Sequence, residues 1–146
     1  MSFRYRLGAW FCVLAGLTLA FRGLLSADFV YWDDHALLAA NPMVRGFDVP
    51  GIFSSLGFGG YFPLTLLSLS LDFHLFGEAA PPMHAVNLLL HALNVFMVYA
   101  LSRRIFGTGE RMAMTIAAVW ALHPLAVEPV AWITGGRKDL LCTFFY

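Results

Sequence analysis

The feature that most constrains this chain is a series of long apolar runs separated by charged residues. The runs cover approximately residues 7–27, 84–101, 112–127 and 140–146 onward. A helix needs about 20 mostly apolar residues to cross a bilayer. The runs therefore predict an all-α, polytopic membrane protein with about four transmembrane helices, the last of which is only begun within these 146 residues.

Composition supports the same interpretation and excludes one class of partner. Sixty percent of the residues are apolar and 12% are charged, whereas a soluble domain has about 25% charged residues. The formal net charge is zero, so no basic field exists to hold a nucleic acid. Cys12 and Cys142 each lie within an apolar run and predict neither a disulfide framework nor a metal pair.

The first run has two interpretations. A basic start, an apolar middle and the small residue Ala20 also fit a secretory signal peptide. We favour a retained helix in which Arg22, close to one end, extends its charge to the lipid headgroups. Either interpretation sends the segment that follows across the membrane.

Basic residues predict the orientation of the helices. Arginines precede the first run and occupy the connection 103–111, while the long loop 28–83 has six acidic residues against the single basic residue Arg45. Cytoplasmic loops carry the excess of Lys and Arg. The N-terminus and 103–111 are therefore expected inside, and the outer loop 28–83 and a turn at 128–139 are expected outside.

The outer loop is expected to be folded. Prolines and glycines mark turns in its first half, and apolar residues recur at helical spacing over Pro63–Phe76. Because proline suits the first turn of a helix, we predict an interfacial helix over 63–76. The cluster Gly57–Gly60 is interpreted as the turn before it, since a phosphate-binding loop would need a preceding strand and a different spacing.

Two adjacent carboxylates, Asp33 and Asp34, follow the first run. On an extended segment neighbouring side chains point opposite ways, so one acid could face a substrate while the scaffold holds the other. A carboxylate near aromatic residues at a membrane surface suits a general base. The alternative is an acidic pair that caps a helix or is solvated.

A polar row lies within the second run: His84, Asn87, His91 and Asn94. Steps of three and four residues place all four on one face of a helix. Polar groups at membrane depth usually face the interior of a bundle or a wet cavity. We favour interhelical hydrogen bonding for the row, with His84, nearest the outer surface, as its substrate-binding member.

A third polar group lies in or just before the turn expected at 128–139: His123, Glu128, Arg137, Lys138 and Asp139. The proline after His123 is expected to end the regular part of the third helix. The two adjacent cations are suited to holding a phosphate. His123 and Glu128 are not at the four-residue spacing of a helical ligand pair, so no metal ligands are assigned, although a divalent metal is left open.

Together these groups resemble the glycosyltransferases of the GT-C fold, and within them the transmembrane and tetratricopeptide-repeat containing protein O-mannosyltransferase-like family. The matching stretches are Phe29–Pro42, Pro63-Leu64-Thr65, His84-x-x-Asn87-x-x-x-His91 and His123-Pro124-x-x-x-Glu128-x-x-x-Trp132-Ile133-x-Gly135-x-Arg137-x-Asp139-Leu140-Leu141. They cover roughly residues 28–146. Phe62 departs from the pattern, because relatives often have an arginine there.

The resemblance implies that the chain is the N-terminal part of a GT-C-like transmembrane domain whose C-terminal remainder is missing and which is inactive alone. It implies a polyprenyl-phosphate sugar donor in the lipid and a protein or glycan acceptor. Asp33 or Asp34 would be the catalytic base, and Arg137 and Lys138 would hold the donor phosphate. His123, Glu128 and Asp139 would also lie at the substrate site, as would His84.

The expected location is a bacterial inner membrane with the site facing the periplasm. Two functions of other classes stay open. One is a transporter whose cavity is lined by the polar row 84–94, although transporter sites usually lie at the midplane of the membrane. The other is a non-catalytic membrane scaffold for a tetratricopeptide repeat domain.

Overall fold

The structure of the chain is a computed structural model that describes residues 3–30, 32–56 and 60–146. Every regular element in these ranges is helical, as the apolar patterning predicted. Tyr31 and most of the expected Gly57–Gly60 turn lie outside the described residues.

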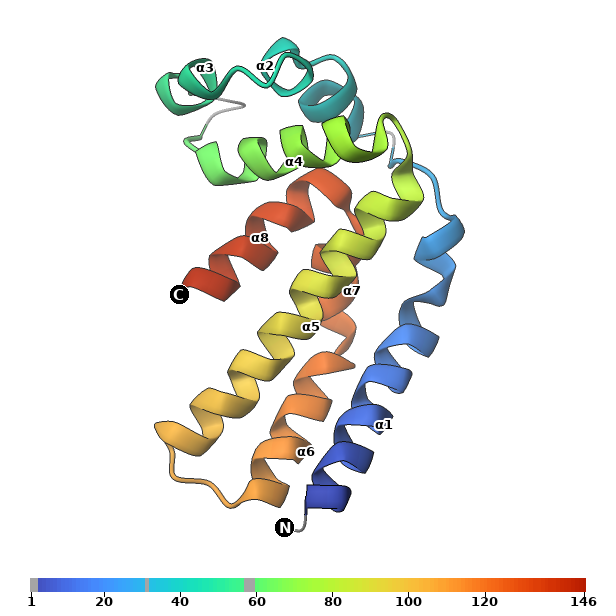
Figure 1. The fold of residues 1–146 in the computed structure, drawn as a ribbon, viewed down its shortest axis with the longest axis vertical. Helices are drawn as coiled ribbons and strands as arrows, with labels where there is room; N and C mark the ends of the chain where they lie inside the picture. Colours follow the sequence, from blue (N-terminus) through green and yellow to red (C-terminus); the bar gives the residue numbers. More distant parts are fainter. Residues whose placement is uncertain (1–2, 31, 57–59) are drawn as a thin grey trace.

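Three long elements lie side by side and form the body of the molecule (Figure 1). They are α1 (Phe3–Phe21), which continues into the 3-10 helix η1 (Arg22–Ser26), α5 (Ala80–Arg104) and α6 (Glu110–Ala121). Among the described residues, two helices are long and apolar enough to cross a membrane: 4–26 and 80–104. The second is longer than the predicted span 84–101, because Pro81 and Pro82 fit the first turn of a helix.

The third span is broken. After α6 the chain forms the 3-10 turn η3 (Pro124–Ala126) and the short helix α7 (Val127–Ala131), bent by 55° from α6. His123 adopts an extended backbone with ψ near 136°, the conformation that a following proline imposes. The predicted end of the regular helix at His123-Pro124 is therefore confirmed, and the two pieces together count as a third candidate span.

The prediction of a turn over residues 128–139 is wrong, because most of these residues are helical. Helix α8 extends over Ile133–Phe145, so Arg137, Lys138 and Asp139 lie on a helix that starts seven residues before the expected Leu140. Only Trp132, with φ −86° and ψ 110°, breaks the helical path. A methyl group on Gly136 would lie 2.0 Å from the Pro129 carbonyl oxygen, so the missing side chain lets α8 pack directly on α7. Gly136 therefore allows a close contact between two helices where a turn was expected.

A count of four spans is not confirmed. Helix α8 has 13 residues, which extend for about 20 Å against a hydrocarbon core of about 30 Å. The described ranges thus contain two spans, or three if the bent pair is one.

The first core lies between the long helices. Val13 and Leu17 of α1 are buried against Val95 of α5 and Ala117 of α6. Large apolar side chains on the outer faces are exposed instead, for example Phe11 at 73% and Leu89 at 60%. Apolar side chains on both faces are typical of helices that contact lipid as well as one another. Helix α1 contributes to this core through Val13, Leu17 and Phe21.

The segment between α1 and α5 forms a folded layer over one end of the bundle (Figure 1). It contains the π-helical turn η2 (His35–Ala39) and helices α2 (Pro42–Arg45), α3 (Val49–Ser54) and α4 (Pro63–Phe76). These elements enclose a second core with Leu38, Val44, Ile52 and Leu69 buried. The predicted folded loop and its helix over 63–76 are confirmed.

Helix starts in this layer follow local chemistry. The side chains of Asn41 and Asp48 accept hydrogen bonds from Met43 N and Gly51 N at 3.0 Å, which caps α2 and α3. At the opposite end of the bundle, Arg6 and Glu110 form an ion pair at 3.1 Å. The start of α1 and the connection before α6 therefore lie at one end, and the folded layer lies at the other, as the predicted orientation requires.

Candidate functional site

The two adjacent aspartates have different environments. Asp34 is 1% exposed. Its Oδ1 accepts hydrogen bonds from Thr134 N at 3.0 Å and Thr134 Oγ1 at 2.7 Å, and its Oδ2 accepts one from Val30 N at 3.0 Å. Thr134 is in the first turn of α8, where backbone N–H groups have no partner within the helix and a negative charge is favourable. Asp34 therefore attaches the outer loop to the start of α8.

Asp33 is half-buried and its carboxylate makes no hydrogen bond with the described residues. The pair does not lie on an extended segment as predicted. The backbone turns here, with Leu37 N donating to the Asp33 carbonyl at 2.8 Å. Trp32 is exposed, and its ring lies 6.0 Å from that of Trp132. The expected division between a held acid and a free acid is observed, and it results from the turn.

The Asp33–Asp34 segment thus contacts the chain at 134, as expected for one shared site. His84 lies near the start of α5, at the end of the bundle that the folded layer covers (Figure 1). It is 1% exposed, and neither ring nitrogen has a hydrogen-bond partner among the described residues. An unpaired buried donor or acceptor costs about 1–3 kcal/mol, so His84 stays a substrate-binding hypothesis.

The rest of the α5 polar row faces the interior of the bundle, as predicted. Asn87 Nδ2 donates to the Trp132 carbonyl at 3.1 Å, and Asn94 Nδ2 donates to the Leu140 carbonyl at 2.9 Å. These bonds connect α5 to α8 and to the residue before it. They favour the interhelical hydrogen-bonding interpretation of the row.

His91 occupies the break in the third span. Its Nε2 lies 3.0 Å from the Ala121 carbonyl oxygen, and its ring is stacked on Trp120 with 5.0 Å between centroids. Ala121 is the last residue of α6, where carbonyls lack intrahelical partners. His91 therefore satisfies a backbone acceptor that the break leaves free.

Arg137 is completely buried, with 0% exposed. Its Nε donates to Asn87 Oδ1 at 2.6 Å, its Nη2 to Asp72 Oδ2 at 2.5 Å and its Nη1 to Ser68 Oγ at 3.3 Å. Burial raises the pKa of the Asp72 carboxyl, and the adjacent guanidinium opposes that shift. Arg137 is thus a structural cation in this structure, and its charge is already paired.

Lys138 has the opposite environment. Its side chain is 45% exposed, lies 3.5 Å from Asp139 Oδ1 and has its Nζ 5.5 Å from the centre of the Phe62 ring. It borders a pocket of about 300 Å³ between the start of α4 and α8. The other residues of this pocket are mostly apolar or aromatic: Tyr61, Phe62, Pro63, Leu64, Thr65, Leu141, Cys142, Phe145 and Tyr146.

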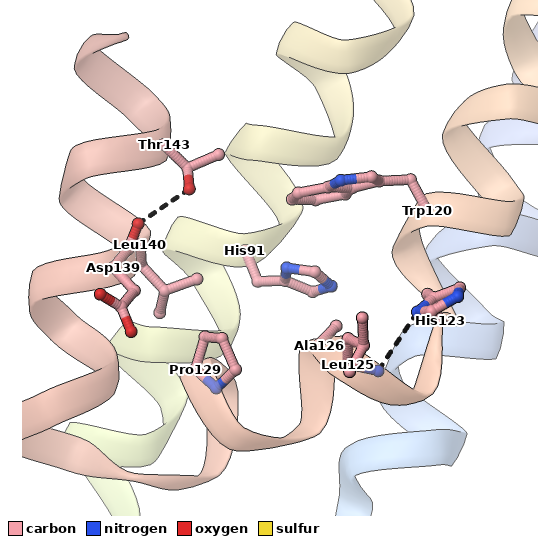
Figure 2. A pocket seen from close by; sticks show the side chains of 9 residues that line it. All are labelled: His91, Trp120, His123, Leu125, Ala126, Pro129, Asp139, Leu140 and Thr143. Carbon is pink, nitrogen blue, oxygen red and sulfur yellow. Dashed lines mark hydrogen bonds between the residues drawn. The ribbon is translucent and has the colours of Figure 1, made fainter.

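His123 and Asp139 border a second pocket of about 360 Å³, beside the break in the third span. Figure 2 shows them on opposite sides of it, with His91 between. The Nδ1 of His123 accepts a hydrogen bond from Leu125 N at 3.2 Å. Glu128 is exposed on α7. The acids and cations that were predicted to share one turn therefore do not form one cluster. Glu128 lies on α7, and on α8 Arg137 is buried while Lys138 and Asp139 border different pockets.

Within the described ranges, no group of three or more His, Cys, Asp or Glu side chains is arranged to hold a metal ion. Two residues central to this region were missed as site residues from the sequence, Asp72 and Thr134. The available signal for Asp72 was a single acid within the apolar helix 63–76. Thr134 has no comparable signal, because its importance depends on a contact across 100 residues.

Comparisons with known proteins agree with the pattern of motifs. The chain is 31% identical over 147 residues to Protein O-mannosyl-transferase TMTC1 of Mus musculus and 32% identical over 148 residues to the Homo sapiens protein of that name, in each case over 91% of the chain. It is 30% identical over 134 residues to Protein O-mannosyl-transferase F38B6.6 of Caenorhabditis elegans, over 83% of the chain.

The chain spans 15%, 16% and 19% of the lengths of these three relatives. No family model matches the chain, and no solved structure matches it. The similarity nevertheless extends over 83–91% of this chain. The resemblance predicted from the sequence is thus confirmed: over most of its own length, the chain is similar to part of the TMTC protein O-mannosyl-transferases.

Proposed function

We propose that this chain is part of a membrane glycosyltransferase that moves a sugar from a polyprenyl-phosphate donor to a hydroxyl group of a protein acceptor. One observation carries the proposal. The acid-bearing loop is hydrogen-bonded directly to the start of α8, through Asp34 and Thr134 at 2.7 and 3.0 Å, and the same helix bears the exposed cation Lys138. The printed name of the relatives adds the transferred sugar, mannose, to the proposal.

Asp33 is the proposed base. Its neighbour Asp34 has both oxygens engaged, whereas the Asp33 carboxylate has no bond to a described residue and is partly exposed. In the transfer, the acceptor hydroxyl loses its proton to Asp33 while its oxygen bonds to the sugar carbon. The bond from that carbon to the donor phosphate breaks, and the phosphate leaves with the bonding electrons.

Lys138 is the proposed contact of the leaving phosphate. An ammonium acts as a point charge for phosphate, and stabilising the charge that develops on a leaving group lowers the barrier. The apolar pocket beside Lys138 suits the first isoprene units of the lipid. Arg137, with its guanidinium paired internally, is assigned no phosphate contact in this proposal.

The proposed site lies on the side of the membrane opposite to the N-terminus, which is the periplasm if the membrane is a bacterial inner membrane. The interfacial position of α4 is part of this proposal. The polar row of α5 does not favour a transporter, because three of its four members are bonded to backbone carbonyls or to Arg137.

Transfer of labelled mannose from polyprenyl-phosphate mannose to peptide acceptors, measured in membranes that contain the protein, tests the proposal. Asp33→Asn should abolish most turnover and Lys138→Ala should raise the KM for the donor. Arg104→Ala, an exposed charge change at the far end of α5, is the matched control. Wild-type transfer by Asp33→Asn would leave the non-catalytic scaffold as the better interpretation.

A further inference from the structure

The buried contacts of Arg137 come from two helices besides its own. Asp72 and Ser68 belong to α4, and Asn87 belongs to α5. Asn87 also donates through its Nδ2 to the Trp132 and Ile133 carbonyls at 3.1 and 3.4 Å. A buried guanidinium is stable only where its charge and its N–H groups are satisfied, so the start of α8 is fixed in place relative to α4 and α5.

Lys138 follows Arg137 directly in the chain. Successive residues of a helix point about 100° apart around its axis. A rotation or shift of α8 that moved the Lys138 ammonium would therefore also pull the Arg137 guanidinium away from its partners. The Phe62 ring, 5.5 Å from Lys138 Nζ, borders the same helix α4 that supplies Asp72. The buried contacts among Asp72, Asn87 and Arg137 thus fix the distance between α4 and α8, the two helices that border the pocket.

We propose that Asp72 and Asn87 are positioning residues for the donor: acting through Arg137, they hold Lys138 at the distance from α4 at which it contacts the donor phosphate. This inference rests on the proposed function. It assigns a role to two residues that contact neither the phosphate nor the acceptor, and it explains why Arg137, the more buried of two adjacent cations, is paired with a buried carboxylate.

A double-mutant cycle separates positioning from general loss of structure. Asp72→Asn should raise the KM for polyprenyl-phosphate mannose about tenfold, the effect of losing one charge-assisted contact, with a smaller change in kcat. In that background Lys138→Ala should add almost nothing, because the contact is already lost. Asp72→Glu, which keeps the carboxylate, should recover most of the affinity.

Ser70→Ala is the matched control on the same helix. Ser70 is buried like Asp72, but its hydroxyl donates to the Val44 carbonyl at 2.6 Å and makes no hydrogen bond to a described residue of α8. Its effect and that of Lys138→Ala should be additive. Arg137→Lys is the milder second variant, because it keeps the charge but cannot reproduce the forked contacts to Asp72 and Asn87.

A cross-linking measurement reports the same geometry without activity. Leu64 and the native Cys142 border one pocket from α4 and α8. In a Cys12→Ser background, Leu64→Cys should react with Cys142 through a short bismaleimide. Asp72→Asn and Arg137→Lys should slow this reaction several-fold relative to Ser70→Ala, while cysteine labelling by a monofunctional maleimide stays the same.

The outcomes distinguish the two proposals. Additive effects of Asp72→Asn and Lys138→Ala, together with unchanged cross-linking, would overturn the positioning role and leave the phosphate contact of Lys138 intact. A lowered donor KM in Asp72→Asn would also overturn it, because Asp72 would then be competing with the phosphate for Arg137. A wild-type KM in Lys138→Ala would instead overturn the phosphate contact itself, and the positioning role with it.

Discussion

Asp34 and Thr134, 100 residues apart in the chain, are joined by two hydrogen bonds to a single carboxylate oxygen. One bond comes from the threonine backbone and the other from its hydroxyl group. The first outer loop and the start of α8 are therefore held together by a buried polar contact. The carboxylate of the neighbouring Asp33 is partly exposed and makes no hydrogen bond to a described residue.

This contact predicts opposite consequences for the two aspartates. Asp33→Asn should lower turnover by about 10²–10⁴-fold, the usual contribution of a general base, without lowering the stability of the protein. Asp34→Asn should destabilise the fold by about 1–3 kcal/mol, because a buried charge-assisted acceptor is weakened. Transfer assays and thermal unfolding in detergent measure the two effects. Equal losses of turnover at unchanged stability would contradict the division of roles.

Close packing of α7 on α8 predicts that Gly136→Ala is destabilising. The added methyl group would lie 2.0 Å from the Pro129 carbonyl oxygen, and such overpacking costs about 1–3 kcal/mol. Gly8→Ala in α1 is the control, since no atom lies within 4 Å of the added carbon. That change should stabilise the helix by about 0.5–1 kcal/mol. Melting temperatures of the two variants should therefore move in opposite directions; a shift of Gly136→Ala upward would show that α7 and α8 are not in contact.

The polar row of α5 predicts a modest effect at Asn94. Asn94→Leu removes the bond to the Leu140 carbonyl, and hydrogen bonds between membrane helices contribute about 0.6 kcal/mol on average, with values up to about 1.7. Leu89→Ala, on the exposed side of the same helix, should change stability less. Unfolding in mixed detergent micelles can compare them. Equal stability of Asn94→Leu and the native chain would mean that this bond contributes nothing net.

Orientation can be tested by labelling cysteines with a membrane-impermeant maleimide, in a background without Cys12 and Cys142. Leu56, which is 80% exposed, lies in the folded layer between α1 and α5. Phe106, which is 75% exposed, lies in the connection 105–109 between α5 and α6. Leu56→Cys should react from outside, and Phe106→Cys should react only after the membrane is permeabilised. The reverse pattern would place the proposed site on the cytoplasmic side.

Sequence patterns predicted the elements whose cause is local. The start of α4 at Pro63, the break at His123 and the buried row on α5 each follow from residues within one or two helical turns. They could be derived because proline geometry and the helical period act over short distances.

What could not be predicted depends on contacts between distant segments. Gly135 and Gly136 have the local preference of a turn, but the packing of α8 on Pro129 overrides it. Arg137 and Lys138 are equivalent as neighbouring cations in the sequence. Partners from distant segments, among them Asp72, 65 residues earlier, pair with the first, while the second stays exposed.

The bond from His91 to the Ala121 carbonyl also bears on how the protein enters the bilayer. Helix α6 has 12 residues, about 18 Å of rise, and a free carbonyl in hydrocarbon costs several kcal/mol. A broken segment of this kind inserts poorly alone. Helix α5 is synthesised first and carries the donor that the break requires, so the two are expected to leave the translocation machinery as one hairpin. We therefore expect insertion of the segment 110–131 to depend on α5.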